Sequence, residues 1–197
     1  QGVSSAASDV YKRQVIDYLD TLPDYKGDRN PAVNAKVVDS QLARHEADLQ
    51  SYIKRSKNPK TQVQTLATSL EDLKAGFHDL DDYVELMPDA QKKVDLFIDT
   101  AVKRLEERAA KNGTITARDI LEVRRALDKQ IFRKKASAGL ENPDLAGAKE
   151  VAGKYVRDEL NQAFLKLMPD DEAYRLINGM SMLFRAKGLL DVKAGKA

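Results

Sequence analysis

The residue of this chain best placed for metal binding or acid–base chemistry is His78. It lies in the segment HDLDDYVE, with Asp82 four positions further on and Glu85 after that. Residues four apart share one face of a helix, so His78 and Asp82 can both contact a divalent cation. Di-iron helical bundles add Glu-x-x-His pairs from further helices, and no such pair occurs in the sequence. We therefore favour an ordinary solvated acidic face beside an apolar stripe, and a metal-dependent helical enzyme is the least favoured reading.

Other catalytic signatures are missing from the sequence. The chain has no cysteine, which excludes disulfides, thiolate catalysis and cysteine-bound zinc or iron–sulfur centres. It also has no G-x-S-x-G motif and no glycine-rich phosphate or dinucleotide loop. We therefore predict a protein that is not an enzyme, with no catalytic, cofactor-binding or metal-binding residues, no cofactor and no small-molecule substrate.

Two clusters of basic residues are candidates for phosphate contacts. They are Lys54, Arg55, Lys57 and Lys60 after the first long helix, and Arg133, Lys134 and Lys135 near the end of the fourth. Both clusters lie at helix C-termini, where cations already offset the helix dipole, and no aromatic side chains interleave with them. The 33 basic and 31 acidic residues leave a net charge of only +2. Nucleic-acid binding by basic helix ends is therefore the alternative function and not the favoured one.

Six amphipathic helices joined by short loops are expected to carry these residues. Asn30 and Pro31 suit the N-cap and first position of the first helix, and Thr116 with Asp119 forms an imperfect capping box before the fourth. No alternating strand pattern of useful length is present. The fold is therefore predicted to be all-α, as a bundle or an extended array of helical hairpins. The predicted ranges are 31–57, 60–87, 89–112, 117–136, 143–168 and 170–193.

The second predicted helix carries an unbroken apolar stripe at alternating steps of three and four. This is the pattern of a coiled-coil or bundle helix, and Pro88 ends it. We call this stripe the seam and predict that it mediates helix association. Burial within the chain is favoured over association between chains, because five other amphipathic helices can cover it. The seam consists of Val63, Leu66, Leu70, Leu73, Phe77, Leu80, Val84 and Met87.

The chain divides into an N-terminal helical region, 15–113, and a C-terminal region of three helices, 114–197. Residues 5–14, SAASDVYKRQ, do not share the helical pattern and resemble translated sequencing-adapter read-through. Residues 1–14 are accordingly expected to be a non-native leader, with the native N-terminus missing. No signal peptide is visible, and no apolar run approaches the roughly 18 residues of a membrane span, so no membrane partner is expected.

Three short motifs in the C-terminal region carry a family resemblance. They are R-x-x-L-D at 124–128, R-x-x-L-N at 157–161, and Pro169 followed by Y-R-x-x-N at 174–178. With the apolar residues around them, they resemble helical segments of long phage-encoded virion-associated proteins over about 116–190. The resemblance implies a structural or scaffolding segment of a larger virion polypeptide, located in the virion or in the cytoplasm of a bacterial host. The expected partners are copies of itself or other virion and scaffold proteins.

Overall fold

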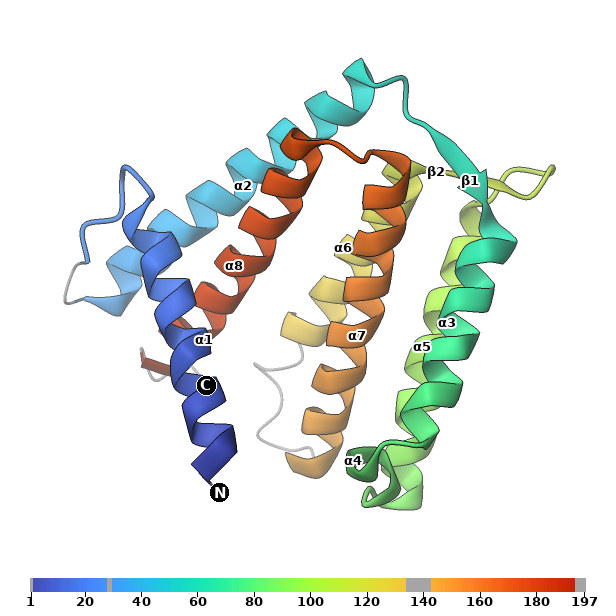
Figure 1. The fold of residues 1–197 in the computed structure, drawn as a ribbon, viewed down its shortest axis with the longest axis horizontal. Helices are drawn as coiled ribbons and strands as arrows, with labels where there is room; N and C mark the ends of the chain where they lie inside the picture. The colour runs from blue at the N-terminus through green and yellow to red at the C-terminus, as the bar shows by residue number, and fades with distance from the viewer. Residues whose placement is uncertain (1, 28–29, 134–142, 194–197) are drawn as a thin grey trace. The chain divides into compact units, whose positions relative to one another are not determined.

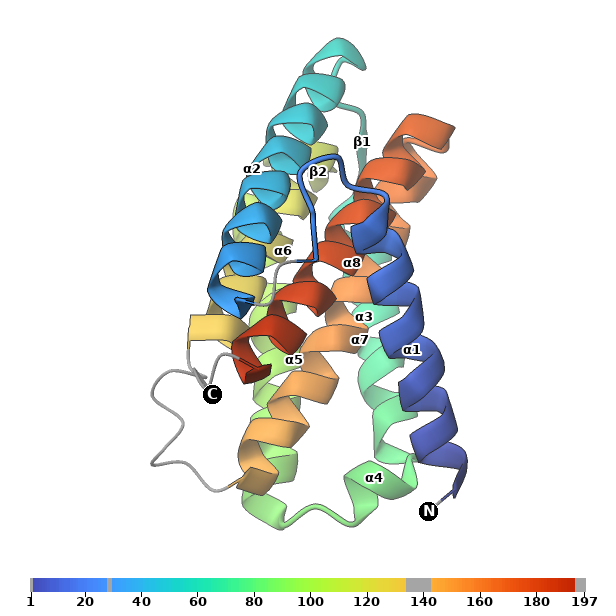
Figure 2. The same cartoon turned by 90° about the vertical axis from the view of Figure 1, so that its left-hand side faces the viewer.

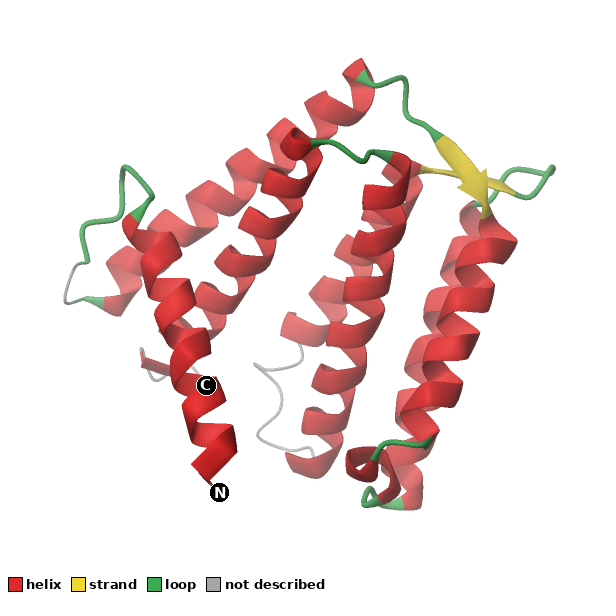
Figure 3. Cartoon of the chain, in the orientation of Figure 1, coloured by secondary structure: helices red, strands yellow, loops and turns green. Residues whose placement is uncertain are grey.

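The chain folds almost entirely into helices in the computed structural model, which describes residues 2–27, 30–133 and 143–193 (Figures 1 and 3). Seven of the described helices have sixteen residues or more, and α4 has four. This confirms the all-α prediction. Within the described residues, no helix has both the length and the apolar composition that a membrane crossing requires. The elements are α1 (Gly2–Asp20), α2 (Pro31–Arg55), β1 (Lys60–Gln62), α3 (Val63–His78), α4 (Asp81–Val84), α5 (Pro88–Arg108), β2 (Thr114–Thr116), α6 (Ala117–Arg133), α7 (Pro143–Leu167) and α8 (Asp171–Lys193).

Helix starts follow the local capping signals. The Asn30 side chain accepts a hydrogen bond from the Ala32 amide at 3.0 Å, with Pro31 at the first position of α2. Thr116 Oγ1 accepts from the Asp119 amide at 3.2 Å and donates to the Asp119 carboxylate at 2.9 Å. Both pairs satisfy amides that have no partner within the helix. The predicted starts of α2 and α6 are therefore confirmed.

A short antiparallel ladder, absent from the sequence prediction, joins two of the helix connections. β1 pairs with β2 in the register Lys60 to Thr116 (Figure 3). The predicted helix 89–112 ends earlier, at Arg108. Gly113 has φ +77° and lies in the turn that leads into β2. Three-residue strands are too short to show an alternating pattern, so they cannot be read from the sequence.

The predicted continuous helix over 60–87 is wrong. α3 ends at His78, and Leu80 takes an extended conformation as the N-cap of the separate short helix α4. A continuous helix would place the acidic residues from Asp79 to Glu85 in its C-terminal half, where the dipole disfavours negative charge. The break instead puts Asp81 at a new helix N-terminus. Gly76, a poor helix former, lies in the last turn before the break.

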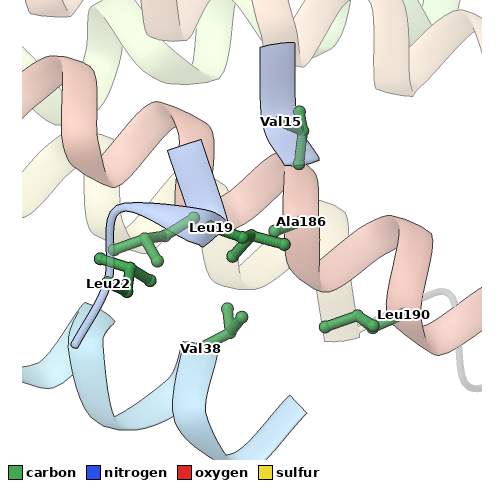
Figure 4. Close-up of a cluster of buried hydrophobic side chains, with 7 residues drawn as sticks. Val15, Leu19, Leu22, Val38, Ala186 and Leu190 are labelled. Carbon is green, nitrogen blue, oxygen red and sulfur yellow. The ribbon is translucent and has the colours of Figure 1, made fainter. Parts of the chain in front are cut away.

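The helices form two compact units, Gln1–Tyr52 with Asp171–Ala197, and Ile53–Asp170. These limits differ from the division at residue 113, because the first unit joins the two ends of the sequence. Residues 2–20, where no helix was expected, form α1. Figure 4 shows the core of the first unit, where α1 packs on α8. The buried members of this core are Val15, Leu19, Leu22, Val38, Leu183, Ala186 and Leu190.

Gly179 on α8 makes close contacts in the first unit. A Cβ atom added there would lie 2.6 Å from His45 Nε2 and 2.8 Å from the Tyr18 hydroxyl oxygen. His45 is held in place, since its Nδ1 donates to the Gln41 carbonyl at 2.9 Å. Nε2 is therefore the acceptor for the Tyr18 hydroxyl, 3.4 Å away. Only a glycine lets α8 approach this pair without displacing it.

Gly179→Ala should lower the free energy of unfolding by about 1–3 kcal/mol, because the added methyl group overpacks the contact. Helix propensity alone predicts the opposite, a gain of about 1 kcal/mol. Gly188→Ala in the same helix is the matched control, because an added Cβ there has no heavy atom within 4 Å. Urea denaturation of both variants tests the contact. Equal stabilisation by the two substitutions would show that α8 does not approach Tyr18 and His45 this closely.

The second unit is organised around α7, which packs against α6, α5 and α3 (Figures 1 and 2). The ladder lies at one end of this unit and α4 at the other. The hydrophobic core side chains with 2% exposure or less are Ile53, Leu70, Ala90, Val94, Ile98, Ala101, Leu105, Ile115, Ala117, Ile120, Leu121, Val123, Leu127, Ala152, Val156, Leu160 and Phe164. The first five residues of the seam, Val63 to Phe77, lie on α3, which packs against α7 in this unit.

Candidate interaction groove on α3 and α7

An open groove with a volume of about 490 Å³ lies along α3 and α7. Phe77 of α3 and Tyr155 of α7 meet edge-to-face across it, with ring centroids 4.8 Å apart. The Phe77 side chain is buried, whereas Tyr155 is 43% exposed. The groove therefore has an apolar base that reaches the surface. Its lining residues are Ser69, Asp72, Leu73, Gly76, Phe77, Leu80, Tyr155 and Glu159.

The structure divides the predicted seam into buried and exposed parts. Leu66, Leu70 and Phe77 are buried, and Val63 and Leu73 are half-buried. The last three members are exposed: Leu80 by 39%, Val84 by 62% and Met87 by 66%. These three follow the break after α3, so they do not continue the buried face of that helix. The end of the seam therefore exposes apolar side chains, and one of them, Leu80, lines the groove.

Gly76 leaves room beside this apolar surface. A Cβ atom added there would have no heavy atom within 4 Å, and the residue has an ordinary helical φ. Neither a close contact nor a strained backbone within the chain therefore requires glycine. Glycine in a helix costs about 1 kcal/mol relative to alanine. Glycine at position 76 therefore keeps the groove open but lowers the stability of the helix.

The charge around the groove is negative. Asp72 on α3 and Glu159 on α7 line it, and neither forms an ion pair with a described residue. Lys74 is held on another face by Asp99 of α5, with Nζ 2.8 Å from Oδ1. This hydrogen bond to Asp99 raises the pKa of Lys74 despite partial desolvation. None of the described residues that line the groove is basic.

His78, the candidate metal ligand, has its partner on another helix. Its Nε2 lies 2.8 Å from Asp95 Oδ1, so the ring donates to a carboxylate on α5. Its ring also stacks on Tyr83, with centroids 4.6 Å apart. The side chain of Asp82 lies outside the described part of the chain, and Glu85 is exposed. Among the described residues, no group of three metal-ligating side chains is found.

Tyr83 belongs to the same cluster as His78 and Asp95, and the ionisation of its hydroxyl can be measured. Its hydroxyl donates to Asp95, with oxygen–oxygen distances of 3.2 and 3.1 Å. Burial, together with the hydrogen bond to Asp95 and its negative charge, raises the pKa of Tyr83 from 10.0 to about 12. Because this value exceeds the unfolded one, the stabilisation is complete below pH 10 and is lost as the pH rises through 12.

We therefore expect Tyr83 to ionise about two pH units above an exposed tyrosine. Ultraviolet absorbance of tyrosinate measures this, over the pH range where circular dichroism still shows native helix. Tyr83→Phe should remove one tyrosine from the amplitude of the late phase and leave the earlier phases unchanged. A late phase of undiminished amplitude in this variant would contradict the assignment.

The described residues of the two basic clusters do not line the groove. Lys54 and Arg55 are exposed in the last turn of α2, and Lys60 is exposed at the start of β1. Lys57, also exposed, has φ 60°, a conformation that glycine usually adopts after a helix. Arg133 ends α6 but its side chain lies outside the described part of the chain, as do Lys134 and Lys135 entirely. The phosphate-binding hypothesis stays a prediction.

The polar residues of two motifs behind the family resemblance meet in the second unit. Arg124 Nη1 donates to Asn161 Oδ1 at 3.0 Å, and Arg157 Nε lies 3.4 Å from Asp128 Oδ1. Each arginine thus reaches the polar residue that ends the other motif. These side chains lie between α6 and α7, away from the lining of the groove. We interpret them as structural.

Comparison of the chain with protein-family models, curated proteins and solved structures found no match. The groove is therefore the feature from which function is inferred. Sequence reasoning identified Leu73, Phe77 and Leu80 as seam residues but missed Tyr155, Glu159, Gly76 and Asp72 as their neighbours. Gly76 was the available signal, since a glycine within an otherwise regular apolar repeat marks a place where bulk is avoided.

Proposed function

We propose that this protein is a non-enzymatic interaction module whose α3–α7 groove receives a helix of a partner protein. The observation that supports the proposal is the exposed apolar surface formed by Leu80, Tyr155 and their neighbours in an open groove. Amphipathic helices bind such grooves by placing apolar side chains from one face into them. Exposed apolar patches rimmed by polar residues commonly mark protein interaction sites.

A structural or scaffolding role in a phage virion is the biological setting that we propose for this module. Its support is the resemblance of residues 116–190 to virion-associated helical segments. That resemblance concerns α6, α7 and α8, whereas the groove uses α3 and α7. The two arguments are therefore largely independent, and the docking proposal does not need the virion setting.

The docking proposal can be tested by selecting a displayed library of helix-forming peptides, about 15 residues long, against the full chain. Gly76→Leu should abolish binding of the selected peptides, because leucine fills the groove without weakening the helix. Gly188→Leu, a matched helical glycine with open space that does not line the groove, should leave binding unchanged. Circular dichroism and melting confirm that both variants fold. Failure to select any binder, or equal binding to both variants, would refute helix docking at this groove.

The alternative function, nucleic-acid binding, rests on the four exposed cations at 54–60. If it holds, affinity for a DNA or RNA duplex should fall steeply with salt. It should also fall when Lys54 and Arg55 are replaced by glutamine. Affinity that is independent of these substitutions would remove the cluster at 54–60 as support for this alternative.

A further inference from the structure

We infer that the helix received by the groove is cationic as well as amphipathic, with Lys or Arg side chains flanking its apolar face. This inference rests on the proposed docking function and specifies the chemistry of the partner. The apolar part of the groove accounts for the apolar face of the bound helix. The charge around the groove determines what must flank that face.

The carboxylates lie on both sides of the groove. Asp72 belongs to α3 and Glu159 to α7, and neither is paired with a described residue. The ion pair with Asp99 keeps Lys74, the one lysine of α3, away from them. Two positive side chains of a bound helix, one on each flank, would therefore find carboxylates that no described group of the chain neutralises.

The negative charge continues beyond the groove beside the exposed end of the seam. Asp79, Asp81 and Glu85 are exposed and alternate with Leu80 and Val84. A partner that buries these apolar side chains must therefore approach several carboxylates. Like charges across an interface disfavour binding, whereas opposite charges speed association and select the partner.

Neither the groove nor the basic segment 54–60 of a second copy of the same chain complements this surface. Pairing of two grooves about a twofold axis would bring equivalent carboxylates such as Asp72 and Glu159 toward each other. The basic segment 54–60 of another copy supplies positive charge. However, among the described residues this segment has no exposed large apolar side chain with which to fill the groove. We therefore assign the groove to a helix of another protein, and self-association of the chain is one outcome of the test below.

Three designed helical peptides with the same apolar face test this inference, with flanking positions that are all Lys, all Gln or all Glu. Fluorescence anisotropy with the full chain should show the Lys peptide binding at least tenfold more tightly than the Glu peptide. The advantage should shrink at high salt, because exposed charges are screened. The double variant Asp72→Asn, Glu159→Gln should reduce this preference severalfold. Glu106→Gln, Glu107→Gln, which removes two exposed charges from α5, is the matched control and should retain it.

The outcomes separate the inference from the proposed function. Equal binding of all three peptides, lost in Gly76→Leu, would refute the cationic partner but keep helix docking. No binding of any peptide, together with failed library selection, would refute both. Concentration-dependent dimers in sedimentation that disappear in Gly76→Leu would overturn the inference in favour of a second copy.

Discussion

Asp128→Ala is expected to lower the free energy of unfolding by about 3–5 kcal/mol, the cost of breaking a buried ion pair by removing one partner. The Asp128 side chain is 5% exposed and lies between the guanidinium groups of Arg124 and Arg157. Its carboxylate oxygens are 3.9 Å from Arg124 Nε and 3.4 Å from Arg157 Nε. Arg124 is 1% exposed, so water cannot solvate its guanidinium group once the Asp128 carboxylate is removed.

The matched control is Asp99→Ala, which breaks an ion pair of the same unit that is shorter but exposed. Asp99 lies 2.8 Å from Lys74, and its side chain is 48% exposed. Surface pairs of this kind contribute about 0–1 kcal/mol. Urea denaturation of both variants compares burial with distance as the cause of the effect. Similar losses in the two variants would show that Asp128 is not buried between the arginines.

The comparison of these two ion pairs shows how much of the fold can be predicted from the sequence. Spacing alone places Arg124 and Asp128 four residues apart on one helical face, an interaction of a few tenths of a kcal/mol in an isolated helix. Its burial depends on α7, which brings to the same place Arg157, 29 residues after Asp128, and Asn161, 37 residues after Arg124. Local spacing predicts the pair, and only tertiary packing determines its energy.

Helix positions were predictable where the signal is local. Asn30 and Thr116 cap their helices through side chains within three residues, so the sequence contains the whole interaction. The break after His78 was missed because the apolar repeat continues across it at the right spacing. Periodicity reports which residues are apolar at helical intervals. It does not report that the acidic residues between Asp79 and Glu85 favour a new helix N-terminus.

The candidate groove was predictable only in part, for a similar reason. Leu73, Phe77 and Leu80 are visible as a stripe, but a groove needs a second wall. That wall is formed by Tyr155 and Glu159, which lie more than seventy residues further along the chain. Asp95, the partner of His78, is likewise on another helix. No pattern within a single helix identifies partners at such separations.

Two neighbouring residues of the seam should therefore have opposite roles. Leu70 is 1% exposed, and Leu70→Ala is expected to cost about 2–5 kcal/mol of stability through the cavity it leaves. Leu73 lines the groove and is half-buried. Leu73→Ala should cost only about 1 kcal/mol, because a partly exposed side chain loses a smaller transfer free energy.

Binding should show the reverse order. Leu73→Ala removes part of the surface that a docked helix covers, so we expect about tenfold weaker binding of the selected peptides. Leu70→Ala should leave the affinity of the folded protein unchanged, since Leu70 does not line the groove. Urea denaturation and peptide titration on the same two variants measure both quantities. Large and equal losses of stability would instead mean that the whole seam is buried, and that the groove between α3 and α7 is closed in solution.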